Sequence, residues 1–237
     1  MNVSILRLDR PDRANALSAD HVERLHDELD RAVADGVDAL VLRSSSHHFC
    51  AGFDLAGLDD EDDASLAHRF LRIGLLLERL LEAPFTTVAV VEGAAVGAGA
   101  DLVAACDQRI GTTDARFRFP GAGFGVVLGT RRLVSLVGGE RALWLTAGQP
   151  VAGAEAHWAG LLTACVPPER VEDEVNRTIA RSVHPVAARG VLRATRYGAS
   201  GYDADAALAD LARSVAVPGL HARLVAHATT TLIRRTA

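Results

Sequence analysis

The stretch Phe49-Cys50-Ala51-Gly52-Phe53-Asp54-Leu55 and the later run Gly97-Ala98-Gly99-Ala100-Asp101-Leu102 decide how this chain is interpreted. Gly52 lets a backbone N–H approach a ligand closely, because glycine has no Cβ to block it. The second run places a glycine-containing turn at the start of a helix, where the first N–H groups have no partner within the helix. Two such donors that converge on one carbonyl oxygen stabilise negative charge on it. The two stretches therefore predict an oxyanion site.

The composition is that of an ordinary globular protein. The chain has 237 residues, of which 49% are hydrophobic and 23% charged, enough apolar material for one large or two small domains. Its net charge of −5 argues against a nucleic-acid surface, and no apolar run has the length needed to span a membrane. The N-terminus lacks the basic and then apolar pattern of a secretory signal. We therefore expect a cytoplasmic protein whose partners are small molecules or copies of itself.

Residue usage excludes several kinds of chemistry. All 25 basic residues are arginine, whereas Schiff-base chemistry, pyridoxal phosphate attachment and Walker-type phosphate sites require a lysine. Any phosphate must therefore be bound by arginine or by backbone N–H groups. The three cysteines, Cys50, Cys106 and Cys165, are far apart and odd in number, which indicates small buried side chains rather than disulfides or a metal site. We expect no metal.

Hydrophobic periodicity predicts alternating strands and helices in the first two thirds of the chain. Three apolar runs are predicted as strands, namely residues 3–8, 39–42 and 86–91. Helices are predicted from the N-cap Ser18 to the stop at Gly36, and over residues 66–81. The acidic run 59–63 is expected to be a solvated loop. This order implies parallel strand pairing and an α/β architecture.

The pattern becomes helical beyond Gly139. Six segments separated by glycine or proline are predicted as helices: residues 140–147, 154–158, 171–182, 186–195, 204–215 and 220–234. We place a boundary near Val183-His184-Pro185, which divides the chain into a core of residues 1–183 and a helical region of residues 184–237. The second region is too short to hold a large core alone. We expect it to pack on the core or on a neighbouring subunit.

Four motifs, in the same order along the chain, resemble those of the crotonase superfamily, the enoyl-CoA hydratase/isomerase family. They are the Arg-Pro and Asn-Ala-Leu signature within residues 8–17, the Phe-x-Ala-Gly-x-Asp-Leu run at 49–55, the glycine-rich stretch from 91 to 107 that ends in Cys-Asp, and the Gly-Leu turn within 154–161. The resemblance implies a spiral of ββα repeats and a C-terminal helical region that forms a homotrimer or hexamer. It also implies an acyl-CoA thioester as ligand, with coenzyme A as part of the substrate and no permanently bound cofactor.

The resemblance assigns roles to particular residues of this chain. The N–H groups of Phe53 and Ala98 are the implied oxyanion donors, and their side chains can vary because both act through the backbone. The ring of Phe53 is larger than the residue usual in the family, so we expect it to narrow the acyl pocket. The implied CoA-binding residues are Arg13, Ala14, Ala51, Asp54 and Leu55, of which Arg13 alone can make a charge-assisted phosphate contact.

Similar hydratases use two catalytic carboxylates, and this chain has one of them. Asp101 occupies the first position, where an apolar pocket would raise its pKa and suit it to acid and base catalysis. An alternative is a structural carboxylate bonded to N–H groups at the start of a helix. The second position aligns with Gly121, which does not titrate and is expected only to line the substrate site. The groups that could replace the missing carboxylate are Glu92, His47, His48 and the acidic run 59–63.

Three functions are compatible with these residues. The first is an acyl-CoA enzyme of the hydratase/isomerase type, in which two amides hold the thioester oxygen and Asp101 moves a proton. The second, prompted by Gly121, is a crotonase-fold protein that has lost catalysis and serves as an acyl-CoA-binding or assembly subunit. The third uses the same oxyanion site for decarboxylation or thioester hydrolysis. A dinucleotide site is disfavoured, because Leu102 stands where the Gly-x-Gly-x-x-Gly fingerprint requires glycine.

Overall fold

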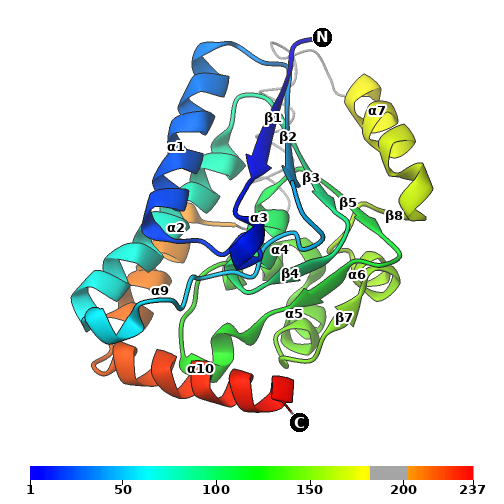
Figure 1. The fold of residues 1–237 in the computed structure, drawn as a ribbon. Coiled ribbons are helices and arrows are strands. Elements are labelled where there is room, and N and C mark those ends of the chain that lie inside the picture. The colour runs from blue at the N-terminus through cyan, green and yellow to red at the C-terminus, as the bar shows by residue number, and fades with distance from the viewer. Residues whose placement is uncertain (182–201, 237) are drawn as a thin grey trace.

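A five-stranded parallel sheet lies at the centre of the fold (Figure 1). In spatial order its strands are β1 (Val3–Leu8), β2 (Ala39–Ser44), β3 (Thr86–Val91), β5 (Gln108–Thr112) and β8 (Ala164–Val166). The computed structural model describes residues 1–181 and 202–236. All six residues of β3 are buried, as expected for a parallel strand that is covered on both faces. The predicted parallel α/β architecture is confirmed.

A smaller sheet contains three short strands. β4 (Ala94–Val96) pairs in parallel with β6 (Arg116–Arg118), and β6 pairs antiparallel with β7 (Val151–Ala152). The chain passes from β3 to β4 through Gly93, where a Cβ would lie only 1.8 Å from the carbonyl oxygen of His47. Two strands of the large sheet, β3 and β5, are each followed in the chain by a strand of the small sheet and then by an α-helix. The helices are α3 (Ala98–Ala105) and α4 (Thr130–Val137), which gives the expected ββα units β3-β4-α3 and β5-β6-α4.

Helices cover both faces of the large sheet. On one side lie α1 (Ala19–Ala34) and α2 (Asp63–Glu82), and on the other lies α7 (Val171–Arg181) (Figure 1). The hydroxyl of Ser18 accepts a hydrogen bond from the N–H of His21 and caps α1, as the sequence predicts. The apolar face of α1 is buried in the main core, whereas α7 packs on a separate cluster formed with β2, β3 and β5. The helices α5 (Gly139–Leu145) and α6 (Gly153–Ala159) flank β7.

The C-terminal helices pack on the core of the same chain. α9 (Ala204–Val215) lies against α2 at Gly74, where a Cβ would come within 2.5 Å of a methyl group of Leu211. α10 (Leu220–Thr236) crosses the end of the molecule beside the 3₁₀ turn η3 (Pro120–Phe124) (Figure 1). Both helices match their predicted ranges closely. The predicted boundary near Val183 and the predicted helix over 186–195 lie outside the described residues.

The acidic run 59–63 is more than the solvated loop that the sequence suggests. Asp59 and Asp60 are exposed and belong to the 3₁₀ turn η2 (Leu58–Asp60). Asp62 caps α2 by accepting the N–H of Ser65, and the carboxylate of Asp63 accepts the N–H groups of Gly219 and His221, both at 2.7 Å. The run therefore fixes the starts of two helices. Over the residues that the structure describes, no helix is both long and apolar enough to cross a membrane.

Candidate active site

The two glycine-containing segments lie against each other in the structure. The N–H of Cys50 donates to the carbonyl of Ala94 at 3.1 Å, and the N–H of Val96 donates back to the carbonyl of Cys50 at 2.9 Å. A Cβ on Gly52 would lie 2.4 Å from the carbonyl oxygen of Val96 and 3.3 Å from the amide nitrogen of Ala98. Gly52 also has a φ of +87°, a value that disfavours any other residue. Only glycine brings the two segments this close.

Phe53 and Ala98 both line one cavity. Gly97 has a φ of +53° and turns the chain from β4 into α3, so that Ala98 becomes the first residue of the helix. The carbonyl of Gly97 accepts the N–H groups of Ala100 and Asp101, at 2.8 and 3.0 Å. No described residue accepts a hydrogen bond from the N–H of Phe53 or of Ala98. The secondary structure of the described residues therefore uses neither N–H group.

Asn15 holds the segment that carries Phe53 in place. This side chain is fully buried, with a φ of +56° that asparagine tolerates better than most residues. Its Oδ1 accepts the N–H of Arg10 at 2.7 Å, and its Nδ2 donates to the carbonyls of His48 at 2.9 Å and Phe49 at 3.1 Å. The N-terminal motif therefore acts as a support that links the loop at residues 10–15 to the segment that carries Phe53.

The cavity beside the two amides has a volume of about 730 Å³. Volumes in this range are typical of sites for small molecules and cofactors. Its walls come mainly from residues 51–55 and 96–101, from η3 and the following loop, and from α10. The large apolar side chains on these walls are Phe53, Leu55, Phe70, Phe124, Val126, Leu128, Leu133 and Leu224. The polar side chains among the described lining residues are Asp101, Arg118, Thr130, Thr146 and His227.

Asp101 lies one helical turn beyond Ala98 and is 8% exposed. A Cβ on Gly129 would lie 2.3 Å from its Oδ1, so only glycine leaves room for this carboxyl group. Burial raises the pKa of Asp101 to about 7. Among the described residues no hydrogen bond or ion pair reaches the carboxylate, in contrast to what a structural helix-start carboxylate would show. The protonated and ionised forms of Asp101 are thus of similar free energy near neutral pH.

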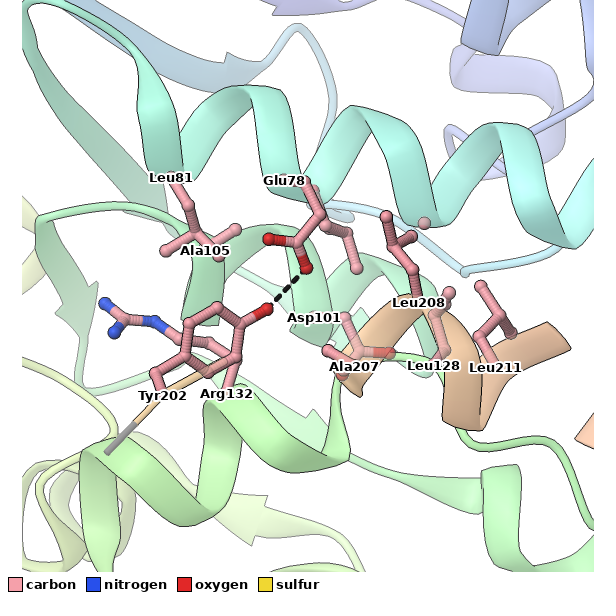
Figure 2. A pocket seen from close by; sticks show the side chains of 13 residues that line it. Glu78, Leu81, Asp101, Ala105, Leu128, Arg132, Tyr202, Ala207, Leu208 and Leu211 are labelled. Carbon is pink, nitrogen blue, oxygen red and sulfur yellow. Dashed lines mark hydrogen bonds between the residues drawn. The ribbon is translucent and has the colours of Figure 1, made fainter. Parts of the chain in front are cut away.

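A second, much smaller space of about 10 Å³ also touches Asp101 (Figure 2). Glu78 of α2 accepts a hydrogen bond from the hydroxyl of Tyr202 there, and burial raises the pKa of Glu78. The Nε of Arg132 donates to the carbonyl of Ala104 at 3.1 Å. This space is too small for a substrate group. It shows instead that Asp101 shares this space with polar side chains from two other helices, Glu78 of α2 and Arg132 of α4, and with Tyr202 before α9.

Phe53 is held between two neighbours. Its ring stacks on Phe70 with the centroids 4.1 Å apart and the planes at 11°, and the guanidinium carbon of Arg69 lies 4.1 Å from its centroid. Arg69 also donates to the carbonyl of Asp54 at 2.7 Å and pairs with Glu61. The aromatic ring at position 53 is therefore held in place by its neighbours, and Phe53 is one of the residues that line the cavity.

The predicted binding residues divide into two groups. Those that line the cavity are Ala51, Leu55 and Gly121, and those that do not are Arg13, Ala14 and Asp54. Arg13 is exposed on the turn η1 (Pro11–Arg13), and the carbonyl of Ala14 accepts the N–H of Ala51 at 2.9 Å. Burial raises the pKa of Asp54, but hydrogen bonds from the N–H of Ala56 and from Arg10 outweigh it and leave that pKa lowered. Asp54 is thus the partner of Arg10, at 2.9 Å.

The groups suggested as substitutes for the missing carboxylate do not line the cavity, namely Glu92, His47, His48 and the acidic run 59–63. Glu92 pairs with Arg43 at 3.2 Å instead. The titratable lining residues that sequence reasoning missed are Arg118 and His227. His227 shares a face of α10 with the buried Leu220 and Leu224, a spacing visible in the sequence.

The cysteines fit the interpretation as unpaired side chains. All three are free thiols; Cys50 and Cys106 are buried, and Cys165 is half-buried. Burial raises the pKa of Cys50 to about 12, so its thiol stays neutral. Within residues 1–181 and 202–236, histidine, cysteine and acidic side chains form no group of three that could hold a metal ion.

The parallel sheet, the ββα units and the cavity between them define a crotonase-type fold. The chain belongs to the enoyl-CoA hydratase/isomerase family, whose sequence model matches residues 1–203. A Bacillus subtilis protein named a probable enoyl-CoA hydratase is 35% identical over 170 residues, which cover 68% of this chain and 64% of that protein. A Mycobacterium bovis protein with the same description is 38% identical over 143 residues, which cover 59% of this chain and 57% of that protein. The matched segments therefore span less than two thirds of these relatives.

A solved structure from Bordetella parapertussis, described as an enoyl-CoA hydratase/isomerase, has the same fold. Its TM-score to this chain is 0.87 at 35% sequence identity, with 95% of this chain and 93% of that chain covered. The crotonase fold predicted from the four motifs is thus confirmed.

Proposed function

We propose that the protein is an acyl-CoA enzyme of the enoyl-CoA hydratase/isomerase type. The observation that carries the proposal is that Phe53 and Ala98, whose N–H groups donate to no described acceptor, line one cavity together with the buried residue Asp101. The names of the Bacillus subtilis and Mycobacterium bovis relatives, and of the Bordetella parapertussis structure, support the same reaction class.

The two amides would stabilise the enolate form of a bound thioester. When water adds to the β-carbon, or a base removes a proton next to the carbonyl, negative charge moves onto the thioester oxygen. Two N–H groups aimed at that oxygen stabilise the charge in the transition state, each by about 3 kcal/mol in comparable sites. Asp101 would then supply or accept the proton at carbon, and its raised pKa leaves both forms accessible near neutral pH.

The rest of the cavity would hold the acyl group and the arm of coenzyme A. The apolar walls suit an acyl chain. Because the chain has no lysine, the phosphate groups must be bound by arginine or by backbone N–H groups. We assign Arg13 to this role, because η1 is joined to the cavity wall by the hydrogen bond between Ala14 and Ala51. Asp54 supports this wall through its pairing with Arg10.

A second function is favoured by Gly121. Since this residue brings no titratable group to the cavity, a protein that binds acyl-CoA without converting it is the main alternative. Decarboxylation or thioester hydrolysis at the same oxyanion site is the third. The three functions predict different products from the same mixtures, so product analysis with enoyl-, malonyl- and aroyl-CoA esters separates them.

The test is turnover by the purified protein and by Asp101→Asn. We expect the protein to hydrate or isomerise at least one enoyl-CoA ester of a chain-length series, followed by ultraviolet absorbance of the conjugated thioester. The Asn variant should bind the saturated ester butyryl-CoA with a Kd within about threefold of the unmodified protein, while kcat falls by about 10²- to 10⁴-fold. Asp114→Asn is the matched control, because Asp114 is exposed and does not line the cavity.

Two outcomes would contradict the proposal. Equal activity of the Asn variant and the unmodified protein would remove Asp101 from the mechanism. Tight binding of all esters with no turnover would support the binding subunit instead.

A further inference from the structure

We infer that His227 of α10 is the second acid-base group of the cavity. It takes the role of the second catalytic carboxylate, which is absent because position 121 is glycine. The inference rests on the proposed function, because it assigns a role within the same reaction.

His227 lies beside the turn in which the second carboxylate is missing. Its ring centroid is 4.8 Å from that of Phe124, and its Nδ1 would lie 4.0 Å from a Cβ on Gly123. Phe124 and Gly123 belong to η3, the turn that also contains Gly121. Every residue of η3 except Gly123 lines the cavity. An imidazole from the C-terminal helix therefore reaches the part of the cavity wall that lacks a titratable group from η3.

The other polar side chains on the described cavity wall cannot take this role. Arg118 does not lose its proton at any ordinary pH, so it cannot serve as a base. Thr130 and Thr146 carry hydroxyl groups that stay neutral and do not titrate in this range. Asp101 already acts at the α-carbon in the proposed mechanism. His227 is the remaining side chain on this wall that can both accept and release a proton near neutral pH.

The surroundings of His227 favour the neutral ring. Burial lowers its pKa, and the positive charge of Arg118 on β6 lowers it further. On its own helix, Arg223 donates to the carbonyl of Val217 at 3.0 Å, and η3 contains no charged residue. Across the cavity, Asp101 of α3 has a raised pKa.

The charges of α2 near α10 are committed elsewhere. Arg69 pairs with Glu61, and Asp63 accepts two N–H groups at the start of α10. At neutral pH the cavity therefore presents a neutral imidazole and a carboxyl group that is partly protonated, which is the pairing that an addition of water needs.

Hydration can be written with both groups. The oxygen of a water molecule forms a bond to the β-carbon while one of its protons passes to the imidazole nitrogen of His227. The electron pair of the C=C bond moves toward the thioester, and the charge collects on the oxygen held by the amides of Phe53 and Ala98. The α-carbon then takes the proton of the Asp101 carboxyl group. Transfer of a proton from imidazolium to aspartate through solvent restores both residues.

The experiment compares His227→Gln with His221→Gln. Both residues lie on α10, but His221 bonds to the carbonyl of Leu58 at 3.0 Å and does not line the cavity. We measure hydration of crotonyl-CoA as a function of pH, and binding of butyryl-CoA by calorimetry. We expect His227→Gln to lower kcat/KM by about 10²- to 10⁴-fold with a Kd within threefold. His221→Gln should stay within about threefold of the unmodified protein in both quantities.

The pH profile distinguishes a catalytic base from a residue that only shapes the wall. Catalysis needs neutral His227 and protonated Asp101, so the unmodified protein should lose activity at low pH through His227 and at high pH through Asp101. In His227→Gln the loss at low pH should disappear. In a double variant that adds Gly121→Glu, at least tenfold of the activity should return, whereas Gly121→Ala in the same background should restore none. A Cβ at position 121 would lie 3.1 Å from the carbonyl of Val126, so the turn must shift slightly to accept either side chain.

The outcomes separate this inference from the proposed function. If the unmodified protein hydrates crotonyl-CoA and His227→Gln retains its activity and its low-pH limb, the role of His227 is overturned while the proposed function stands. A loss of activity in step with a loss of butyryl-CoA binding also overturns it, because the residue is then structural. If the unmodified protein converts no enoyl-CoA ester of the series, the proposed function fails and the role of His227 fails with it.

Discussion

Asp54 and Asp101 are both buried carboxylates, yet their surroundings move their pKa values in opposite directions. Asp54 is 7% exposed and Asp101 is 8% exposed, so burial alone does not separate them. The N–H of Ala56 and the guanidinium of Arg10 bond to Asp54 and lower its pKa, whereas burial raises the pKa of Asp101 to about 7. Hydrogen-bond donors therefore decide which carboxylate supports a loop and which is available for proton transfer.

The raised pKa of Asp101 predicts a pH-dependent stability. A carboxyl group whose pKa is higher in the folded state binds its proton more tightly there, so its contribution to stability is fully present below pH 3.8 and is lost as the pH rises to about 7. Between pH 5 and pH 8 the free energy of unfolding should fall by about 3 kcal/mol through this group. The Asp101→Asn variant should not show this fall, because asparagine does not titrate. Urea unfolding at the two pH values, with Asp114→Asn as control, measures the difference. An equal pH dependence in Asp101→Asn and the unmodified protein would contradict the assignment.

At the scale of elements, the helices with clear caps could be predicted from the sequence and the short strands could not. Ser18 caps α1 and Asp203 caps α9, and the apolar spacing within each helix is regular. β4, β6, β7 and β8 contain two or three residues each, which is too short for any periodicity. Their positions are decided by pairing between segments distant in the sequence, such as Phe117 with Val151.

The residues of the candidate site also differ in whether the sequence could predict them. The glycines that bring the amides of Phe53 and Ala98 together carry a local signal, because a positive φ or a close approach demands glycine. His227 carries no such signal, since its place on the cavity wall depends on how α10 docks against η3. The side chain that caps this docked helix, Asp63, lies in a run that sequence composition alone assigns to solvent.

Asp63→Ala is predicted to loosen α10. The change removes two hydrogen bonds to the N–H groups of Gly219 and His221 and an anionic group at the start of the helix, which lowers the stability of the helix end. We expect faster hydrogen exchange in residues 220–230 and a higher KM for enoyl-CoA esters, because Leu224 and His227 line the cavity. Asp60→Ala is the matched control, since Asp60 is exposed and in η2. Unchanged exchange in α10 would show that other contacts hold the helix.

At the scale of the whole molecule, α5 and α6 expose large apolar side chains. Leu143 is 70% exposed, Trp144 43% and Trp158 71%, and the guanidinium carbon of Arg141 lies 5.3 Å from the ring centroid of Trp158. Figure 1 places both helices on the side of the molecule away from α1. Such a surface is suited to contact between subunits. The expected homotrimer or hexamer is not described by a single chain and stays a prediction.

The double change Leu143→Glu and Trp158→Glu is predicted to reduce the assembly to smaller species. Burying the two introduced carboxylates in a subunit interface is strongly unfavourable, whereas on the surface of a monomer both are solvated by water. Light scattering coupled to gel filtration should give a mass near three or six times that of one chain, 25.0 kDa, for the unmodified protein and a lower mass for the variant. Val33→Glu, at a position 47% exposed on α1, is the control. A monomeric unmodified protein would contradict the prediction.

The docking of α10 has a consequence for how the protein becomes active during its synthesis. Phe53 and Ala98 both come early in the chain, whereas the cavity wall that Leu224, His227 and Ala228 provide comes from its last helix. A ribosome that terminates after residue 181 but before residue 220 would release a chain that contains every described strand but lacks the cavity wall formed by α10. Retention on an immobilised acyl-CoA would therefore separate full translation products from truncated ones.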